Sequence, residues 1–430
     1  MSRTGLSRRE VIALFSASLP CLLTRSDADS NSLVPLTERD VWIGAYAPPA
    51  PWLSMTPVTK LENSIGRRLD IVHIYTAWGE EWGAYSSEIV RQLSSAVSDG
   101  RRALITWEPW TLGQGVNQDE FSLRRIARGS FDSYIRTWAK GLGGFPGTVY
   151  LRPMHEMNGD WYPWCVGVNG NRPQDYTRAW RRMWSIFQQE HVTNVRWIWC
   201  PYAVDDASKV LEQTYPGDRY VNLLGLDVYN WGTSVHYSQD ASGSNRWRPV
   251  EECLEAAYRR ISGFAPQPVW LPEVGCAEDG GDKAQWLKDL LGSPGYDRIS
   301  AVVFFDVDKE RDWRVDSSLA SVNAVAASLA GTRPANESEI SPPTPFDVRA
   351  ERWLKAIKVS WSVTGNVSTL IYAITIFADG EALKTLNIGS SGRYTFRRPI
   401  KYRSYSFAAQ SISQFGASAM SEQSAPISFN

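Results

Sequence analysis

The strongest constraint on the fold is a regular alternation, between residues 40 and 330, of short apolar runs with segments of helical periodicity. The runs are rich in β-branched and aromatic residues, which favour strands. Eight strands are expected, at 41–46, 69–75, 102–107, 148–153, 195–200, 221–229, 269–272 and 301–306. The helices expected between them include 86–99, 131–142, 173–190, 250–264 and 283–291. Eight strand-then-helix units predict a (β/α)8 TIM barrel, and a doubly wound open sheet is the second choice.

The composition changes after the expected barrel. Residues 331–345, GTRPANESEISPPTP, are polar and rich in Pro and Ser, which predicts a linker. Residues 346–430 hold short alternating runs separated by Gly and Asn turns, which predict a small all-β sandwich. The Pro-rich start, the segment around Trp361 and the YSFAAQS segment at 405–411 resemble fibronectin type III domains. Because no row of exposed aromatic residues is evident, we expect a spacer rather than a sugar-binding module.

The N-terminal segment has the layout of an export signal. SRREVI at 7–12 resembles a bacterial twin-arginine signal, and the apolar run at 11–23 is too short to span a bilayer. We therefore expect residues 1–25 to direct export to the periplasm or the medium. A short anchor or a buried helix is the alternative, and no other stretch is apolar enough for a membrane span.

The overall charge argues for a neutral ligand. The chain has 45 Lys and Arg against 46 Asp and Glu, a formal net charge of −1, which would not gather nucleic acid or an anionic membrane. Its 20 Trp and 18 Tyr supply aromatic faces with polar edges, which suit wet and partly apolar ligands. The cysteines after the signal-like segment show no CxxC spacing, so no zinc site is expected and three disulfide pairings stay open. These are Cys165, Cys200, Cys253 and Cys276.

The richest group of polar side chains follows the fourth expected strand, in YLRPMHEMNGDWYPW at 150–164. The carboxyl group of Glu156 can transfer a proton. The side chains that can bind sugar hydroxyls are Arg152, His155 and Asn158. The rings that can face the apolar side of a sugar are Trp161, Tyr162 and Trp164. Barrel active sites lie past the carboxyl ends of the strands, so this placement favours a binding site for a sugar.

Glu273 follows the seventh expected strand and gives Glu156 a partner. Cleavage of a glycosidic bond needs one carboxyl group to protonate the leaving oxygen and a second to attack the sugar or activate water. A retaining reaction predicts carboxyl groups about 5–5.5 Å apart, with Glu273 as nucleophile and Glu156 as acid and then base. Burial and the charge of Glu273 would keep Glu156 protonated near neutral pH.

Other reaction types lack their residues. His155-Glu156 begins like the helical zinc-protease motif, but the position four after His155 is Gly159 rather than a second histidine. The chain has no GxSxG, no P-loop and no GxGxxG after an expected strand. We therefore expect neither a metal nor a cofactor.

Four motifs, in order along the chain, resemble glycoside hydrolase family 26. They are WEPW at 107–110, RPMHEMNGDWYPW at 152–164, GLDVY at 225–229 and PEVG at 272–275. The family is known mostly for endo-β-mannanases and also for some mixed-linkage β-glucanases and β-1,3-xylanases. The resemblance covers roughly residues 40–330 and implies a retaining mechanism with Glu156 as acid/base and Glu273 as nucleophile. It also implies that His155 and Asn158 contact the sugar, that Trp161 lines the cleavage subsite and that Tyr229 hydrogen-bonds the nucleophile.

Some positions keep two interpretations. Trp107 and Trp110 are either sugar platforms or packing at the rim, and Glu108 and Asp227 either orient Arg152 or His155 or cap the following segments. Barrels of this superfamily often end the eighth strand with a tryptophan, whereas this chain has FFD at 304–306. The floor of the cleavage subsite is then expected at Phe305 or Trp313.

We expect a secreted, monomeric, retaining endo-β-glycanase that hydrolyses β-1,4-mannan or glucomannan. Mixed-linkage β-glucan, or an exopolysaccharide trimmed during export, is the nearest alternative substrate, and transglycosylation differs only in the acceptor. A hypothesis of another class is a barrel that has lost catalysis and binds glycan or scaffolds a surface assembly. The presence of both Glu156 and Glu273 favours the enzyme.

Overall fold

The structure is a computed structural model of the 430-residue chain. It describes residues 35–36, 41–79, 92–204, 209–233, 246–332, 342–364, 371–388, 392–397, 399–413, 416–418 and 420–429. The expected signal at 1–25 and most of the expected linker, 333–341, lie outside the described residues. Both stay predictions.

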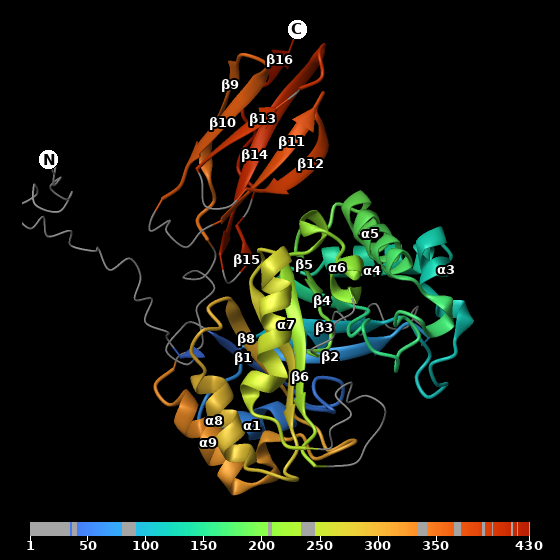
Figure 1. The fold of residues 1–430 in the computed structure, drawn as a ribbon, viewed down its shortest axis with the longest axis vertical. Coiled ribbons are helices and arrows are strands. Elements are labelled where there is room, and N and C mark those ends of the chain that lie inside the picture. The colour runs from blue at the N-terminus through green and yellow to red at the C-terminus, as the bar shows by residue number, and fades with distance from the viewer. Residues whose placement is uncertain are drawn as a thin grey trace, which may run out of the picture. The chain divides into compact units, whose positions relative to one another are not determined.

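Eight parallel strands close into a barrel, so the predicted (β/α)8 fold is confirmed (Figure 1). They are β1 (Trp42–Tyr46), β2 (Ile71–Ala77), β3 (Arg102–Glu108), β4 (Val149–Pro153), β5 (Val195–Trp199), β6 (Leu223–Asn230), β7 (Val269–Cys276) and β8 (Ile299–Phe305). The strands pair in chain order and β8 returns to β1, with Trp42 beside Ala301 and Tyr46 beside Phe305. Every residue of β3, β6, β7 and β8 is buried, as expected for parallel strands covered on both faces.

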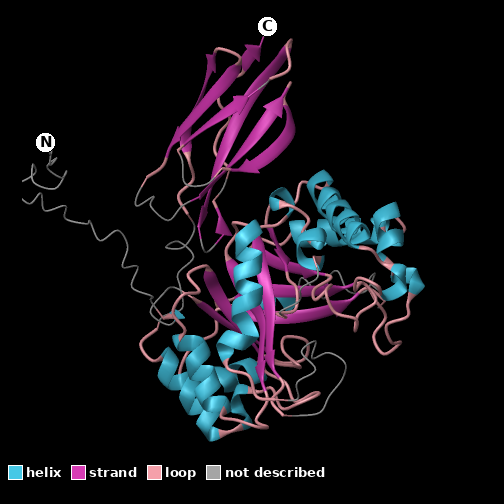
Figure 2. Cartoon of the chain, in the orientation of Figure 1, coloured by secondary structure: helices cyan, strands magenta, loops and turns pink. Residues whose placement is uncertain are grey.

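Helices surround the barrel (Figure 2). They are α1 (Thr56–Ile65), α3 (Leu123–Arg128), α4 (Asp132–Gly143), α5 (Pro173–Gln189), α6 (Val210–Thr214), α7 (Val250–Phe264), α8 (Lys283–Gly292) and α9 (Leu319–Leu329), with 3-10 turns η3 (Asp119–Phe121), η4 (Val168–Gly170), η5 (Asp218–Tyr220) and η6 (Val315–Ser317). Residues 92–97 are also helical, within the expected helix at 86–99, whose first residues lie outside the described part. The helix α5 shows why these segments form: its apolar side chains recur at helical spacing, so Tyr176, Trp180, Met183 and Phe187 are all buried.

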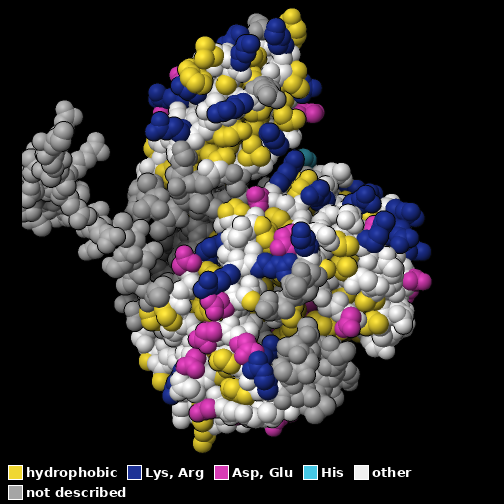
Figure 3. Space-filling view, viewed as in Figure 1, with side chains coloured by type: hydrophobic (Ala, Val, Ile, Leu, Met, Phe, Trp, Pro, Cys, Tyr) yellow, Lys and Arg dark blue, Asp and Glu magenta, His cyan; other side chains and the backbone are white. Residues whose placement is uncertain are grey.

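Two apolar layers hold the barrel together. One fills its interior and includes Trp42, Ile71, Leu104, Tyr150, Ile198, Leu223, Trp270 and Val303. The other lies between strands and helices and is much larger. At about 25 cal/mol per Å² of buried apolar surface, such layers dominate the stability of the fold. On the face of the barrel shown in Figure 3, Lys and Arg are interspersed with Asp and Glu, in keeping with the net charge of −1.

In the described residues from 346 onward, all the strands pair in antiparallel sheets, as the all-β prediction required. One sheet has the order β13 (Arg393–Arg397), β10 (Ala356–Ser362), β9 (Phe346–Trp353). The other has the order β12 (Glu381–Asn387), β11 (Ile371–Ala378), β14 (Arg403–Ser413), β15 (Gly416–Ala417), with β16 (Ile427–Phe429) also on β14. The two sheets share a separate core that includes Ile357, Trp361, Tyr372, Ile376 and Phe407. The finer prediction of a fibronectin type III fold stays a prediction.

Among the described residues, no helix combines the length and the apolar character that crossing a bilayer requires. The four cysteines outside the signal-like segment are buried free thiols, so none of the three pairings is formed in this structure.

Candidate active site

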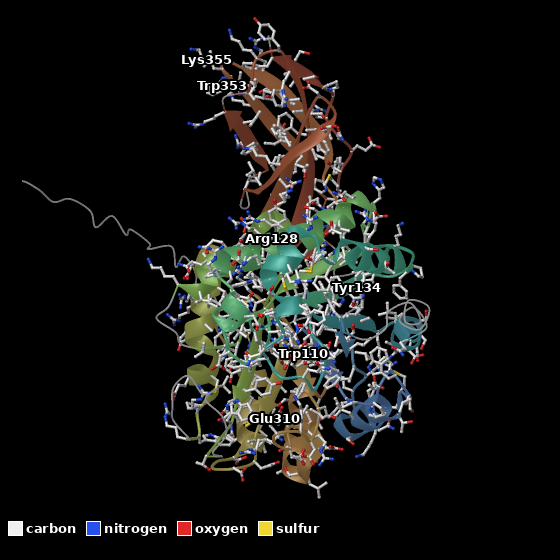
Figure 4. The ribbon with its side chains drawn as sticks, turned by 90° about the vertical axis from the view of Figure 1, so that its right-hand side faces the viewer. Trp110, Arg128, Tyr134, Glu310, Trp353 and Lys355 are labelled. Atoms are coloured by element: carbon white, nitrogen blue, oxygen red, sulfur yellow. The ribbon has the colours of Figure 1, made fainter. Side chains whose placement is uncertain are left out.

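A cavity of about 670 Å³ lies at the carboxyl ends of the barrel strands. Each of the eight strands, or the loop after it, contributes to the wall. Eleven of its twenty lining residues are aromatic: Tyr46, Trp52, Tyr75, Trp110, Trp161, Tyr162, Tyr202, Tyr229, Trp231, Phe305 and Trp313. The cavity also exposes the carboxyl groups of Glu108, Glu156, Glu273 and Glu310. Trp110 and Glu310 are labelled in Figure 4. Flat apolar rings with a few carboxyl groups can hold a pyranose ring by its C–H face.

The loop after β4 turns Glu156 into this cavity. Met154 and Glu156 both have left-handed backbones, with φ of 51° and 52°, a conformation that costs energy for residues other than glycine. The turn is held by the Glu156 backbone N–H, which donates to the carbonyl of Cys200 at 2.7 Å. The Trp161 indole N–H donates to Glu156 Oε2 at 2.6 Å. Burial, and then the charge of Glu273, raises the pKa of Glu156 to about 8.

Glu273 lies in β7 among hydrogen-bond donors. Its Oε2 accepts from the Tyr229 hydroxyl at 2.6 Å, and its Oε1 accepts from the Tyr75 hydroxyl and from Arg152. A Cβ on Gly275 would lie 2.5 Å from a ring carbon of Tyr229, so this glycine lets the ring lie against β7. The three donors stabilise the negative charge of the Glu273 carboxylate.

Arg152 links the barrel strands beneath the cavity. It is fully buried, and its guanidinium binds Asp227 at 2.6 Å as well as Glu273. Asp227 and Glu273 are neighbours in the register of β6 and β7. Although burial opposes it, these two carboxylates raise the pKa of Arg152 well above its ordinary value. The Nε of Arg152 donates to the hydroxyl of Thr106 at 2.8 Å, which fixes the plane of the guanidinium. Arg152 therefore touches the predicted nucleophile and does not line the cavity.

His155 and Asn158 lie behind the cavity wall. The His155 ring is fully buried, 3.2 Å from the Tyr162 hydroxyl and 3.8 Å from Glu273 Oε1. Burial, and then the charge of Arg152, lowers the pKa of His155 well below its ordinary value, so the ring is neutral. Asn158 exchanges two hydrogen bonds with the backbone of Tyr202, each 2.9 Å long, and so ties the Glu156 loop to the end of β5.

Two of the predicted sugar platforms are not on the cavity. Trp107 is fully buried and packs on Trp78 and Trp138, because successive strand residues point to opposite faces and Glu108 takes the inward position. Trp164 is also fully buried, and its indole N–H donates to the carbonyl of His155 at 2.6 Å. Neither is among the residues that line the cavity in this structure. For Trp107 this agrees with packing, one of its two interpretations, and the sugar contact expected of Trp164 stays a prediction. Trp161 and Tyr229 do line the cavity.

Comparisons with known proteins agree with this geometry. The sequence profile of Glycosyl hydrolase family 26 matches residues 130–244, which contain β4, the Glu156 loop and β6. Endoglucanase H of Acetivibrio thermocellus is 33% identical over 284 residues, 64% of this chain and 29% of that protein. Residues 130–244 are thus similar to glycosyl hydrolase family 26, and the alignment with Endoglucanase H extends the similarity over 64% of the chain. Mannan endo-1,4-beta-mannosidase A and B of Caldalkalibacillus mannanilyticus is 38% identical over 90 residues, 19% of this chain and 17% of that protein. The chain thus spans 29% and 17% of the length of these two relatives.

Solved structures share the fold of the barrel. An endo-beta-1,4-mannanase double mutant of Cellulomonas fimi superposes with a TM-score of 0.52 at 16% identity, covering 90% of this chain and 94% of that chain. The catalytic domain of a Bacillus sp. JAMB-750 GH26 endo-beta-1,4-mannanase gives 0.54 at 17% identity, covering 71% and 89%. At these identities the likeness shows the fold alone.

Among the described residues of the barrel, three side chains bring potential metal ligands within 4.8 Å of one another: His155, Asp227 and Glu273. Arg152 already binds both carboxylates of this set. The group is therefore an ion-pair network, and its negative charge is not free to hold a cation.

Sequence reasoning missed several residues on the cavity wall. Tyr75, which binds Glu273, ends an expected strand, and its position alone could have identified it. Trp52 and Tyr202 lie in loops that carry no motif, whereas Trp231 follows the GLDVY motif at the end of the sixth expected strand, where polar and aromatic residues were expected to reach the active face. Phe305 and Trp313, the two expected floor residues, both line the cavity and pack around Tyr229 at ring distances of 6.0 and 5.0 Å.

Proposed function

We propose that this protein is an endo-β-glycanase that cleaves by double displacement, with Glu273 as nucleophile and Glu156 as acid/base. The observation that carries the proposal is the presence of the two carboxyl groups in one aromatic cavity but in opposite environments. Glu273 faces a guanidinium and two phenols, which favour the carboxylate that attack requires. Glu156 is buried beside that negative charge, which favours the protonated acid.

In the first step, a Glu273 oxygen forms a bond to the anomeric carbon while the bond to the leaving oxygen breaks. Glu156 gives its proton to that oxygen, so the departing chain leaves as a neutral alcohol. In the second step, water attacks the same carbon, Glu156 takes one water proton, and Glu273 leaves as a carboxylate. The product keeps the anomeric configuration of the substrate.

Tyr229 and Arg152 position the nucleophile in this scheme. Each binds one oxygen of Glu273, which prevents the carboxylate from rotating away from the sugar. Trp161 binds Glu156 Oε2 and lines the cavity, so it positions the acid and offers a ring to the substrate. His155 and Asn158 support this loop, and the family resemblance suggests sugar contacts for both.

Two β-glycans deserve testing as substrate. The sequence motifs favour β-1,4-mannan or glucomannan. The mannosidase relative supports that substrate, although its alignment covers 19% of this chain. The alignment with Endoglucanase H covers 64% of the chain, so β-glucan ranks at least equally. Manno and gluco sugars differ in the orientation of one hydroxyl, which side chains of the cavity discriminate.

The test is a panel of mannan, glucomannan, mixed-linkage β-glucan and β-1,3-xylan, with reducing ends and product lengths as the readout. Wild type is compared with Glu156→Ala, Glu273→Ala and the control Glu212→Ala, an exposed carboxylate that pairs with Arg260 at 2.8 Å. We expect wild type and the control to cleave one glycan into oligosaccharides, with β-anomers formed first by NMR. Binding of a glycan without cleavage by wild type would favour the non-catalytic alternative instead.

Export stays part of the proposal, because the predicted signal at 1–25 lies outside the described residues. Changing Arg8 and Arg9 to Lys should retain the protein in the cytoplasm of a bacterial host, as judged by fractionation. We also propose that the C-terminal sheets form a fibronectin type III-like spacer, and that the enzyme acts as a monomer.

A further inference from the structure

Glu108 is a buried carboxyl group on the cavity wall that the proposed mechanism does not use. It ends β3, is 4% exposed and lines the cavity with Glu156 and Glu273. Its Oε2 accepts a hydrogen bond from the Trp110 indole N–H at 3.2 Å. Among the described residues, the Trp110 indole is the side chain seen to bind this carboxyl group. A carboxyl group on a cavity wall that has hydrogen-bonding capacity to spare can form a further contact with a ligand.

The surroundings of Glu108 are firmly held. The Trp110 ring packs edge-on against Tyr162 and Trp164, with ring centroids 5.4 and 5.8 Å apart. Tyr162 in turn stacks on Trp164 at 4.4 Å. The carboxyl group therefore has a fixed direction, which a residue that selects a ligand by hydrogen bonding requires.

No cation pairs with Glu108 among the residues that the structure describes. Burial is the largest cause that raises the pKa of this carboxyl to about 8, while the Trp110 hydrogen bond and then the charge of Arg152 act in the opposite direction. The group is therefore a neutral carboxylic acid at pH 7. A neutral acid has an O–H that donates and a second oxygen that accepts, whereas a carboxylate only accepts.

We propose that Glu108 is a specificity-determining residue that donates a hydrogen bond to a hydroxyl of the sugar bound beside Trp110. The inference rests on the proposed glycanase function and extends it to the recognition of one hydroxyl. A sugar that presents this hydroxyl completes the Glu108 contact. A sugar with the opposite configuration leaves a buried donor unpaired, which a desolvated site penalises strongly.

Two variants separate this role from a purely structural one. Glu108→Gln keeps the shape, the acceptor for Trp110 and an N–H donor, but it cannot ionise. Glu108→Leu keeps the bulk and loses both polar functions. We expect Glu108→Gln to stay within about threefold of wild type on the preferred glycan and Glu108→Leu to lose roughly 10- to 100-fold in kcat/KM.

The decisive readout is selectivity. For Glu108→Leu, the ratio of kcat/KM between the preferred glycan and its epimeric competitor should fall about tenfold or more, because only the preferred sugar loses a contact. Equal losses on all glycans, or unchanged ratios, would overturn the inference. Thermal unfolding of each variant identifies any loss that comes from misfolding, and Glu212→Gln is the matched surface control.

Binding gives a second test that does not need turnover. In a Glu156→Gln background the acid/base no longer titrates, and oligosaccharide affinity is measured by calorimetry from about pH 6 to 9. In the Glu156→Gln protein, the Kd should rise by up to about tenfold per pH unit above the pKa of Glu108, because Glu108 then loses the proton that it donates. In the double variant with Glu108→Gln, the Kd should stay level over the same pH range. A slope unchanged by Glu108→Gln would contradict the proposal.

The other groups near Glu108 should not produce this slope. They are Tyr46, Arg152, Tyr162, Glu273 and Lys309. The pKa values of Arg152 and Lys309 are raised, so both side chains stay charged. Burial is the main cause that raises the pKa of Tyr46 to about 12 and that of Tyr162 well above its usual value, so both phenols stay neutral. Glu273 is present in every binding variant, so its charge is common to all the proteins that are compared.

Two outcomes distinguish the inference from the proposed function. If wild type cleaves none of the glycans, the proposed function fails. If wild type cleaves a glycan and the Glu108 variants keep its selectivity, only this inference fails.

Discussion

At the residue scale, the raised pKa of Glu156 has two consequences. It keeps the carboxyl group protonated for the proposed reaction, and it makes the ionised form unfavourable for the stability of the folded protein. Burial and the charge of Glu273 raise its pKa from 4.5 to about 8. An acid with this pKa is protonated at neutral pH and close enough to the working pH to release its proton. We expect kcat/KM on the preferred glycan to fall above about pH 8, as Glu156 loses its proton. A pH profile that stays level to pH 9.5 would contradict the assignment of Glu156 as the acid.

The same shift predicts a pH-dependent stability. Between pH 4.5 and about 8 the folded protein holds the Glu156 proton while the unfolded chain has released it. The free energy of unfolding should therefore fall as pH rises through this window and level off above it. Glu156→Gln removes this contribution, so the variant should lose less stability than wild type between pH 5 and pH 8 in urea unfolding. Parallel pH dependences of the two proteins would refute the prediction.

Tyr229 provides a test of how Glu273, the proposed nucleophile, is held in position. Tyr229→Phe removes the 2.6 Å hydrogen bond to Glu273 Oε2 and keeps the ring that packs on Phe305 and Trp313. We expect kcat/KM to fall roughly 10- to 100-fold, with a nearly unchanged melting temperature. The control is Tyr215→Phe, whose hydroxyl bonds Asp218 and Gln267 at 2.7 and 3.0 Å away from the cavity. An equal effect of both variants would argue against a specific role for Tyr229.

At the element scale, Arg152 joins three strands of the barrel through buried ion pairs. Arg152→Met leaves the carboxylates of Asp227 and Glu273 without their cation, so the free energy of unfolding should fall by about 3–5 kcal/mol. Arg182→Met breaks the partly exposed pair with Asp132 and should cost less than about 1 kcal/mol. Denaturant unfolding of the two variants at pH 7 checks the difference. Similar losses would mean that the buried network contributes little.

The loop after β4 depends on a glycine. A Cβ on Gly159 would lie 2.5 Å from the indole of Trp161, which binds Glu156 and lines the cavity. Gly159→Ala should displace that ring and lower kcat/KM by about tenfold or more while the fold survives. Gly263→Ala is the control, because nothing lies within 4 Å of its Cβ position in α7. That change should leave activity intact and stabilise the protein by up to about 1 kcal/mol.

Elements were predictable where the chain repeats a local pattern. The eight barrel strands and helices such as α5 and α7 lie within a few residues of their expected bounds. The helix α9 was missed because its sequence, LASVNAVAASL, is apolar on most sides and shows weak periodicity. The strand β12, EALKTLN, consists largely of helix-favouring residues, and its pairing with β11 overrides that preference.

At the scale of the whole molecule, the barrel and the C-terminal sheets have separate apolar cores. A chain that ends at Thr332 keeps every strand and labelled helix of the barrel, so it should fold and retain activity within about twofold. A chain that ends at Ser318 lacks α9, which buries Val325 and Leu329, and should be insoluble or unfolded. Circular dichroism and the glycan assay compare the two. Loss of folding in the longer fragment would show that the barrel needs the C-terminal sheets.

The sequence by itself determined the barrel and predicted that Glu156 and Glu273 reach one cavity, because both follow from periodicity and from where polar residues end the strands. Only the tertiary structure decided which rings face the cavity. Trp107 and Trp164 turn into the core, while Trp231 reaches the wall. The physical reason is that the direction of a side chain depends on the strand pleat and on loop conformation, such as the left-handed backbone of Glu156, and local composition encodes neither.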